Sequence, residues 1–209
     1  MQRFDILIKD GIILTMDSKD TIIKNGCLGI KGDSISYVGE MIKKTDAKKV
    51  IDAGGHIVLP GLINGHTHAA MTLFRGLADD LPLMEWLTKY IFPAESRIDA
   101  DFVYKGTLLA CAEMIMSGTT TFCDMYLFAG DAATAAKAAG MRCLMGEVLY
   151  DFDSPNYGPV AKGLRYTEDL IKKWSGEPLV SIAVEPHAVF TCSPDLLTCL
   201  LYTSDAADE

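Results

Sequence analysis

The sequence contains no apolar run that approaches the ~18 residues of a membrane-spanning helix. Its first residues also lack the apolar core and cleavage site of a signal peptide. Basic residues form no stripe, and 19 Lys and Arg stand against 28 Asp and Glu, which gives a net charge of −9. An acidic surface argues against nucleic acid or an anionic membrane as the main partner. We therefore expect a cytoplasmic protein with neither kind of partner.

The six cysteines include no Cys-x-x-Cys pair, and most of them lie in apolar runs. A disulfide framework is typical of short secreted domains rather than of a chain of 209 residues. We expect free, buried thiols in a reducing compartment. The composition, 49% apolar and 22% charged, is that of a globular protein with one or two domains.

Residues 1–56 predict a small all-β domain. The turn pairs Asp10-Gly11, Asn25-Gly26 and Gly32-Asp33 separate short β-prone runs, and such pairs are typical of hairpins because they tolerate positive φ. Residues 43–49 are highly charged, which favours a solvated connection.

Two of the four histidines lie in one short stretch, residues 57–68. The stretch begins as an apolar, β-branched run, breaks at Asn64-Gly65 and then supplies His66 and His68. Side chains two residues apart in an extended chain point the same way. Two imidazoles beyond a buried strand make half of a first-row metal site, although a bare His-x-His also occurs as unrelated surface histidines in a turn.

Residues 57–198 alternate between strand and helix patterns. Strands are predicted at 57–64, 119–124, 141–149 and 179–184, and helices at 99–117, at 132–139, from Thr167 and from Pro194. A repeated βα pattern means a parallel sheet. In a (β/α)₈ barrel of about 250 residues the chemistry lies at the carboxyl ends of the strands, where the histidine pair falls. This part of the chain supplies only about half of such a barrel.

Residues 199–209 lack the apolar periodicity of the preceding chain. They resemble the translation of a sequencing adapter, so we expect a non-native tail and a natural protein that continues beyond it. The alternative is a natural acidic tail.

Several segments together resemble a known family. Residues 59–68, Leu-Pro-Gly-Leu-Ile-Asn-Gly-His-Thr-His, are similar to the first-strand signature of the amidohydrolase superfamily. The continuation is similar to the methylthioadenosine/S-adenosylhomocysteine deaminase branch in residues 71–80, 84–87, 91–95 and 118–125 and in Pro186-His187. The likeness runs to about residue 198.

The resemblance implies a metal-dependent (β/α)₈ barrel with a small β-sandwich whose strands come from both chain ends. His66 and His68 would bind one divalent metal, Zn²⁺ with Fe²⁺ or Mn²⁺ as alternatives. Glu95 would hold ribose hydroxyls, and Trp86 and His187 would line a nucleoside pocket. The family takes its other ligands and its acid/base groups from later strands, so the resemblance places no catalytic residue in this chain.

Each of these residues also has a structural interpretation. Trp86 could be a packing residue, Glu95 could cap a helix, and His187 could be a satisfied core histidine. Asp124 could hydrogen-bond the backbone near the site or simply end its strand. His56 receives no role.

The chain departs from the family pattern at Gly146-Glu147, where nucleoside deaminases of this branch often have an arginine. Arg142 lies near the start of that strand and does not replace it. We expect Glu147 to face the substrate, where it would repel a carboxylate tail such as that of S-adenosylhomocysteine and favour a neutral or cationic nucleoside.

The resemblance therefore implies hydrolytic deamination of an adenosine-like nucleoside, or of a related aminated heterocycle, by metal-activated water. The alternatives are guanine or cytosine deamination, triazine hydrolysis, or an inactive truncated protein with a binding or structural role. We expect this chain alone to be inactive and to aggregate, and the full-length protein could form a homo-oligomer.

Overall fold

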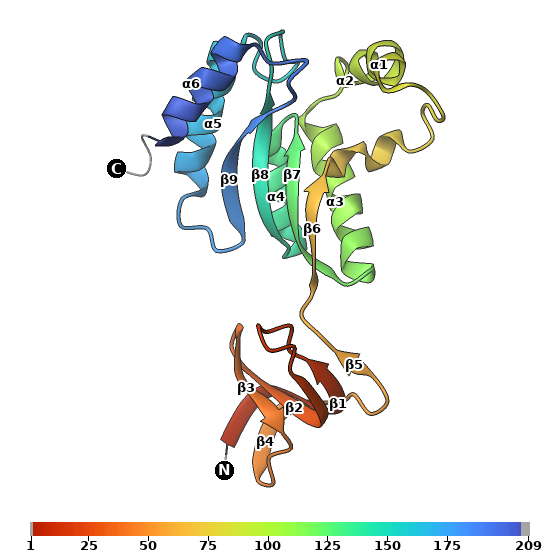
Figure 1. Ribbon diagram of the computed structural model, residues 1–209, viewed down its shortest axis with the longest axis vertical. Coiled ribbons are helices and arrows are strands. Elements are labelled where there is room, and N and C mark those ends of the chain that lie inside the picture. The colour runs from red at the N-terminus through yellow and green to blue at the C-terminus, as the bar shows by residue number, and fades with distance from the viewer. Residues whose placement is uncertain (1, 206–209) are drawn as a thin grey trace. The chain divides into compact units, whose positions relative to one another are not determined.

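The computed structural model describes residues 2–205 and divides the chain after Gly61 into two compact units (Figure 1). Unit 1 comprises residues 1–61 and unit 2 comprises residues 62–209. None of the helices in the described residues combines the length and the apolarity needed to cross a membrane.

Unit 1 is a single sheet in the order β3-β2-β1-β4, with β5 also paired to β1. β1 is antiparallel to β2 and parallel to β4 and β5. A small apolar core of Phe4, Leu7 and Cys27 holds the sheet together. The strands are β1 (Gln2–Leu14), β2 (Ile22–Lys31), β3 (Ser34–Glu40), β4 (Thr45–Asp52) and β5 (Ile57–Val58).

Only one of the three predicted hairpin turns is a hairpin turn. Gly32-Asp33 joins β2 to β3, whereas Asp10-Gly11 lies inside β1 and Asn25-Gly26 inside β2. Asp10 and Asn25 do have positive φ, 62° and 50°. The register of β1 against β2 shifts on both sides of Gly11, so these residues serve β-bulges, which need the same backbone freedom.

Two further expectations for this region were wrong. Residues 45–49 are not a solvated connection but part of β4, where Lys48 pairs with Asp5 at 2.7 Å. The predicted stretch 57–68 is also two strands rather than one, because Ile57–Val58 pairs with β1. The division between the units therefore lies after Gly61 rather than at the predicted boundary of 56/57.

Unit 2 contains a four-stranded parallel sheet in the order β6-β7-β8-β9, as the βα pattern predicted. Helices follow every strand, and α1 and α2 lie beyond the carboxyl ends of the strands (Figure 1). These four units are the first half of a (β/α)₈ barrel. The strands are β6 (Leu62–Thr67), β7 (Thr119–Tyr126), β8 (Arg142–Leu149) and β9 (Val180–Pro186). The helices are η1 (Ala69–Phe74), α1 (Leu83–Trp86), η2 (Leu87–Ile91), α2 (Phe92–Glu95), α3 (Ala100–Met116), α4 (Ala129–Ala139), α5 (Val160–Trp174) and α6 (Pro194–Asp205).

Local sequence explains two of these helix ends. The Asp99 side chain accepts a hydrogen bond from the Phe102 N–H at the start of α3, and Gly140 ends α4 with φ 73°. The start of α5 was predicted wrongly: the helix begins at Val160, and Thr167 lies in its interior. The Thr167 hydroxyl donates to the Gly163 carbonyl one turn earlier, so a residue that resembles a cap is used within the helix.

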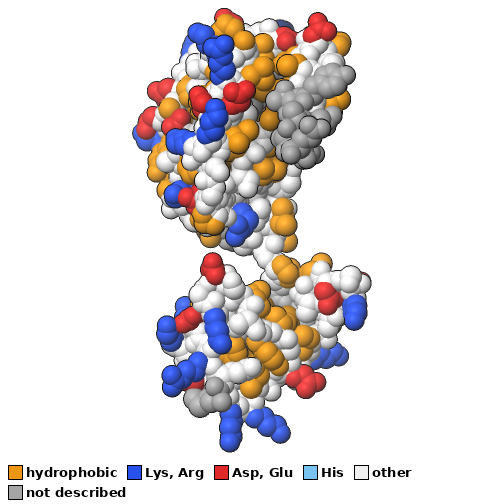
Figure 2. All heavy atoms as spheres, turned by 90° about the vertical axis from the view of Figure 1, so that its left-hand side faces the viewer, with side chains coloured by type: hydrophobic (Ala, Val, Ile, Leu, Met, Phe, Trp, Pro, Cys, Tyr) orange, Lys and Arg blue, Asp and Glu red, His pale blue; other side chains and the backbone are white. Residues whose placement is uncertain are grey.

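The helices pack closely on the sheet because their contact faces are small. Five alanines of α4 are fully buried, and the core around them includes Phe122, Met145 and Leu149. Cys111, Cys143 and Cys192 are buried free thiols in the same core, as expected. Hydrophobic side chains nevertheless reach the surface (Figure 2), including Leu62, Ile63 and Leu144 on the strands of unit 2.

Part of the predicted tail belongs to the fold. α6 continues to Asp205, and Leu200 is packed into the core of unit 2 with 6% of its surface exposed. Residues 206–209 lie outside the described residues. The proposed origin of the segment 199–209 stays a prediction.

Candidate metal centre and substrate pocket

His66 and His68 lie together at the carboxyl end of β6. Their ring centroids are 5.2 Å apart and the rings are nearly perpendicular, at 79°. Two imidazoles bound to one tetrahedral ion, with Zn–N bonds of about 2 Å, would have ring centres roughly 5 Å apart. The donor set and its spacing therefore fit two corners of a metal site.

The ring of His68 is held in one tautomer. Its Nδ1 lies 2.7 Å from the Met125 carbonyl oxygen, which can only accept, so Nδ1 carries the proton. The other ring nitrogen, Nε2, is then a lone-pair donor, and fixing a ligand histidine through its second nitrogen is typical of metal sites.

Asp124 anchors the backbone that follows His68. Its Oδ1 accepts a hydrogen bond from the Ala69 N–H at 2.6 Å, so the first interpretation of this residue, a hydrogen bond to the backbone near the site, is confirmed. Burial raises the pKa of the Asp124 carboxyl to about 7, against the lowering effect of the Ala69 hydrogen bond. Its Oδ2 has no partner among the described residues.

Glu185 on β9 is a further acidic group near the pair. Burial raises the pKa of its carboxyl, and the charge of His66 opposes that shift. Its side chain occupies the space where a Cβ at position 146 would lie, so Gly146 on β8 makes room for it. His66 itself is exposed and donates its backbone N–H to Asn64 Oδ1 at 3.3 Å.

A cavity beside His68 brings together three of the four predicted substrate-binding residues: Trp86, Glu95 and His187. Its remaining lining is mostly apolar or aromatic, which is typical of a small-molecule site with few polar groups. The Trp86 Nε1–H donates to the Ala78 carbonyl at 3.1 Å, which leaves the indole face for the cavity.

Glu95 presents a carboxyl group to this cavity. Burial raises its pKa to about 7, and the nearby Tyr126 hydroxyl opposes the shift. The two groups do not have hydrogen-bond geometry, and the Tyr126 hydroxyl has no partner among residues 2–205. Both polar groups are therefore available to a ligand.

His187 directly follows β9 and lines the same cavity. Its Nδ1 is 2.7 Å from the Thr191 hydroxyl, and the Tyr150 ring meets it edge-on with centroids 6.1 Å apart. Burial, and secondarily the charge of His68, lower the pKa of His187 and favour the neutral ring.

Glu147 does not line the cavity, which corrects the expectation that it would face the substrate. Its side chain is fully buried and accepts hydrogen bonds from the Ala129 N–H at 2.7 Å and Asn156 Nδ2 at 2.9 Å. Side chains alternate along a strand, so Gly146 and Val148 face the barrel interior while Glu147 faces the start of α4. Burial raises the pKa of its carboxyl to about 7.

The described residues supply only part of a metal site. Within residues 2–205 no group of three or more His, Cys, Asp or Glu side chains is placed to hold an ion. A catalytic zinc usually has three protein ligands, so two imidazoles leave it under-coordinated.

Comparison with known proteins places this arrangement in a family. The model of the amidohydrolase family matches residues 57–209, which is most of the chain. The chain belongs to the amidohydrolase family.

Several similar curated proteins are named as deaminases. The chain is 59% identical over 199 residues to the 5-methylthioadenosine/S-adenosylhomocysteine deaminase of Syntrophobacter fumaroxidans, with 94% of this chain and 45% of that protein covered. It is 45% identical over 196 residues to the 5′-deoxyadenosine deaminase of Methanosarcina acetivorans, with 93% and 45% covered. The chain thus spans about half the length of the curated relatives it matches.

A solved structure also matches this chain over about half of its own length. The crystal structure of an adenosine deaminase from Xanthomonas campestris with bound zinc matches with a TM-score of 0.94 and 32% identity. The match covers 99% of this chain and 48% of that protein. It confirms the half-barrel with its amino-terminal strands as an amidohydrolase fold.

Sequence reasoning missed several residues of this amidohydrolase pocket. Tyr126 ends β7 and Tyr150 follows β8 directly, and both line the cavity. The rule that selected the histidines, position at the carboxyl end of a parallel strand, would also have selected these tyrosines. Thr191 had no such signal, because its role depends on the turn that brings it back to His187.

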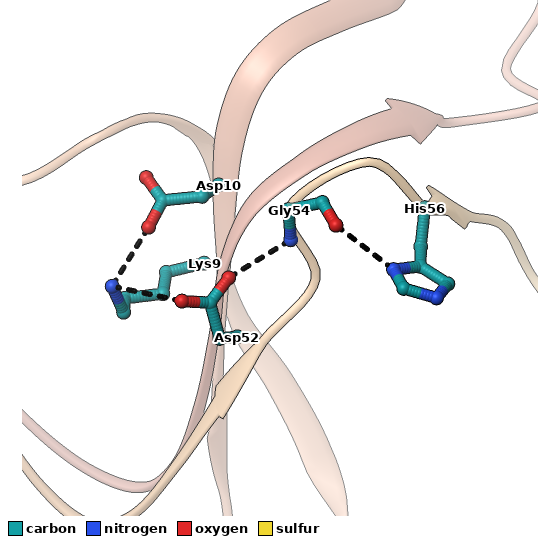
Figure 3. Close-up of polar contacts among 5 residues, drawn as sticks. All are labelled: Lys9, Asp10, Asp52, Gly54 and His56. Carbon is teal, nitrogen blue, oxygen red and sulfur yellow. Dashed lines mark hydrogen bonds and ion pairs between the residues drawn. The ribbon is translucent and has the colours of Figure 1, made fainter.

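His56, for which no role was predicted, lies in unit 1 of the amidohydrolase chain. Figure 3 shows it in the turn between β4 and β5, where its Nδ1 is 3.0 Å from the Gly54 carbonyl oxygen. The Gly54 N–H donates to Asp52, which also pairs with Lys9 (Figure 3). All of these polar contacts join residues of unit 1, so a change at His56 provides a control for changes at the other histidines.

Proposed function

We propose that the chain is the amino-terminal half of a metal-dependent hydrolase that deaminates an adenosine-like nucleoside. The observation that carries the proposal is the His66–His68 pair beside a cavity that also holds Trp86, Glu95 and His187. The deaminases named among its relatives support the substrate class.

His66 and the Nε2 of His68 would hold one divalent ion, with further ligands from the second half of the protein. Such an ion, when bound, acts as a Lewis acid and activates water for attack on the amine-bearing carbon. Imidazole ligands suit Zn²⁺, which the Xanthomonas relative contains, and Fe²⁺ and Mn²⁺ remain alternatives.

Different residues of the cavity would contact different parts of a nucleoside. The exposed face of Trp86 and the ring of Tyr150 would contact the flat purine. The Glu95 carboxylate would accept hydrogen bonds from ribose hydroxyls, and the neutral His187 ring would hydrogen-bond the base or the sugar. The apolar lining would keep bulk water from the reacting carbon.

Glu147 does not exclude substrates that carry a carboxylate tail. Because this carboxyl faces α4 and is bonded to Ala129 and Asn156, it cannot repel a carboxylate tail in the cavity. S-adenosylhomocysteine therefore belongs among the candidate substrates with methylthioadenosine, 5′-deoxyadenosine and adenosine. We further propose a cytoplasmic location, since the buried thiols Cys111 and Cys143 suit a reducing compartment.

An ammonia-release assay of the full-length gene product tests the proposal. The purified protein, loaded with Zn²⁺, is assayed with these four nucleosides and with guanine, cytosine and a triazine as controls. Release from one or more adenine nucleosides, and much slower release from the controls, is expected. Turnover of guanine, cytosine or the triazine alone would contradict the nucleoside assignment.

A further inference from the structure

The Thr191 hydroxyl lies between two possible acceptors. It is 2.7 Å from His187 Nδ1 and 3.2 Å from the Ala188 carbonyl oxygen. A hydroxyl has one proton, so it can donate to only one of these atoms at a time.

The Ala188 carbonyl is already satisfied by the backbone. It accepts the Thr191 N–H at 3.1 Å and the Cys192 N–H at 3.0 Å. These two donors use both lone pairs of the carbonyl oxygen, and a third donor at 3.2 Å would compete with them. With both acceptor positions of Ala188 filled and the shorter contact at Nδ1, the hydroxyl is better placed to donate its proton to Nδ1.

The consequence is a fixed tautomer for His187. In a neutral imidazole one nitrogen donates and the other accepts, so Nδ1 as acceptor places the ring proton on Nε2. Because Thr191 occupies Nδ1, Nε2 is the nitrogen available to a ligand in the cavity. His68, on the same cavity, has the opposite arrangement, with its proton on Nδ1 and directed to Met125.

We propose that Thr191 is a positioning residue that fixes His187 in its Nε2–H tautomer, so that the cavity presents a hydrogen-bond donor at this point. The ligand atom it recognises is then an acceptor, such as a purine ring nitrogen or a sugar oxygen, and not an amino group. The tautomer follows from the protein alone. The identity of the ligand atom rests on the proposed function.

The first test reads the tautomer directly in the full-length protein. The ¹⁵N chemical shifts of histidine rings distinguish a protonated from an unprotonated nitrogen, and the His187 signal is assigned by its loss in His187→Gln. We expect protonated Nε2 in the wild type and in Thr191→Ser, and a mixture or a reversal in Thr191→Val. A wild-type ring protonated at Nδ1, or no change in Thr191→Val, would overturn the proposal.

The second test is kinetic and separates positioning from folding. Removing one hydrogen bond of this kind costs about tenfold in the step it supports. Thr191→Val should raise KM for the nucleoside by about that factor, and Thr191→Ser should restore it. Thr134→Val, which removes a hydroxyl bonded to the Gly130 carbonyl in α4, is the matched control and should leave KM unchanged.

Failure of one test can be distinguished from failure of the other. If no nucleoside is turned over but the ring signals behave as expected, the proposed function is wrong and the role of Thr191 stands. If turnover occurs and Thr191→Val matches Thr134→Val in both readouts, Thr191 is only structural. Should Thr191→Val fail to fold, the wild-type and Thr191→Ser signals still decide the tautomer.

Discussion

At the scale of single residues, hydrogen bonds to neighbouring groups hold several residues of the site in place. His68 is fixed through a backbone carbonyl, His187 through a hydroxyl, and Ala69 through the buried Asp124. For Glu95 burial is the larger influence on the pKa of the carboxyl, and the nearby Tyr126 hydroxyl opposes it. The protonation state of Glu95 should therefore change with pH near neutrality.

The Glu95 carboxyl should make substrate binding pH-dependent. Its pKa is raised to about 7, so it is protonated below that pH and loses its ability to accept two hydroxyl hydrogen bonds. We expect KM for the nucleoside to rise as pH falls through about 7. Glu95→Gln should lower kcat/KM by roughly 10- to 100-fold and remove this dependence.

Steady-state kinetics from about pH 6 to pH 8.5 measure the effect. Glu113→Gln, which changes an exposed carboxylate paired with Arg75, is the control and should retain the wild-type profile. A Glu95→Gln variant with the wild-type pH profile would contradict the role of this residue.

Glu147 should affect stability rather than recognition. Burial raises the pKa of its carboxyl from 4.5 to about 7 in the folded protein, so the folded state binds a proton that the unfolded state releases between these values. Its stabilising contribution is complete below about pH 4.5 and is lost as pH rises through 7. The loss amounts to about 3 kcal/mol at most.

Urea unfolding of the full-length protein at about pH 5 and pH 8 measures this linkage. The free energy of unfolding should fall more with rising pH in the wild type than in Glu147→Gln, which has no charge to bury. Equal slopes would show that the carboxyl is already ionised in the fold at low pH, held by the Ala129 and Asn156 hydrogen bonds.

Position along a strand was enough to predict where three of the histidines lie, while their roles stay predictions. His66 lies at the carboxyl end of β6, and His68 and His187 directly follow β6 and β9, where a parallel sheet brings strand ends together. Glu147 failed because it lies one position away from a cavity-facing residue, and a single step reverses the face of a strand. The family resemblance predicted the position of Glu147 in the strand but not the direction of its side chain.

At the scale of elements, the placement of His68 depends on the contact between η1 and α3. Gly106 in α3 packs against the backbone of Ala70, and a Cβ there would lie 2.6 Å from the Ala70 carbonyl oxygen and 2.9 Å from its Cα. The Thr72 hydroxyl also donates to the Gly106 carbonyl at 3.0 Å. Because η1 follows His68 directly, a shift in this contact would move the histidine pair.

Gly106→Ala should destabilise the protein despite a better helix propensity. Alanine would stabilise a helix interior by up to about 1 kcal/mol, but the backbone clash costs about 1–3 kcal/mol. We expect a lower free energy of unfolding and weaker metal binding, measured by urea unfolding and by competition with a chelator. A gain in stability with unchanged metal affinity would show that η1 and α3 are not tightly coupled.

The element predictions were most accurate where two signals agreed. The strands and helices of unit 2 combine an apolar period with capping residues such as Asp99 and Gly140, and all four βα units were found. In unit 1 the pairs Asp10-Gly11 and Asn25-Gly26 correctly indicated a positive φ. They did not show whether the backbone there forms a hairpin turn or a β-bulge. A bulge and a hairpin need the same backbone conformation, and only the pairing of distant strands distinguishes them.

At the scale of the whole molecule, the described sheet of unit 2 ends in two edges. β6 pairs only with β7 and β9 only with β8 among the described strands, and Ile63 is 74% exposed. A closed barrel would pair these edges and cover the apolar side chains. We expect the 209-residue chain expressed alone to aggregate and to lack deaminase activity.

Size-exclusion chromatography with light scattering tests this expectation. The full-length gene product, prepared in parallel, should elute as a defined species. A monodisperse monomer of the 209-residue chain with a sharp, cooperative thermal transition would contradict the prediction, because the described edges would then be stable without partners.

His66 and His68 are proposed to bind the metal ion of a hydrolase. The most direct measurement is the metal content per chain of full-length protein after zinc loading and dialysis, for the wild type, His66→Ala, His68→Ala and His56→Ala. We predict about one ion in the wild type and in His56→Ala, and a loss of most of it in the other two variants. Equal metal content in all four proteins would contradict the assignment of this site.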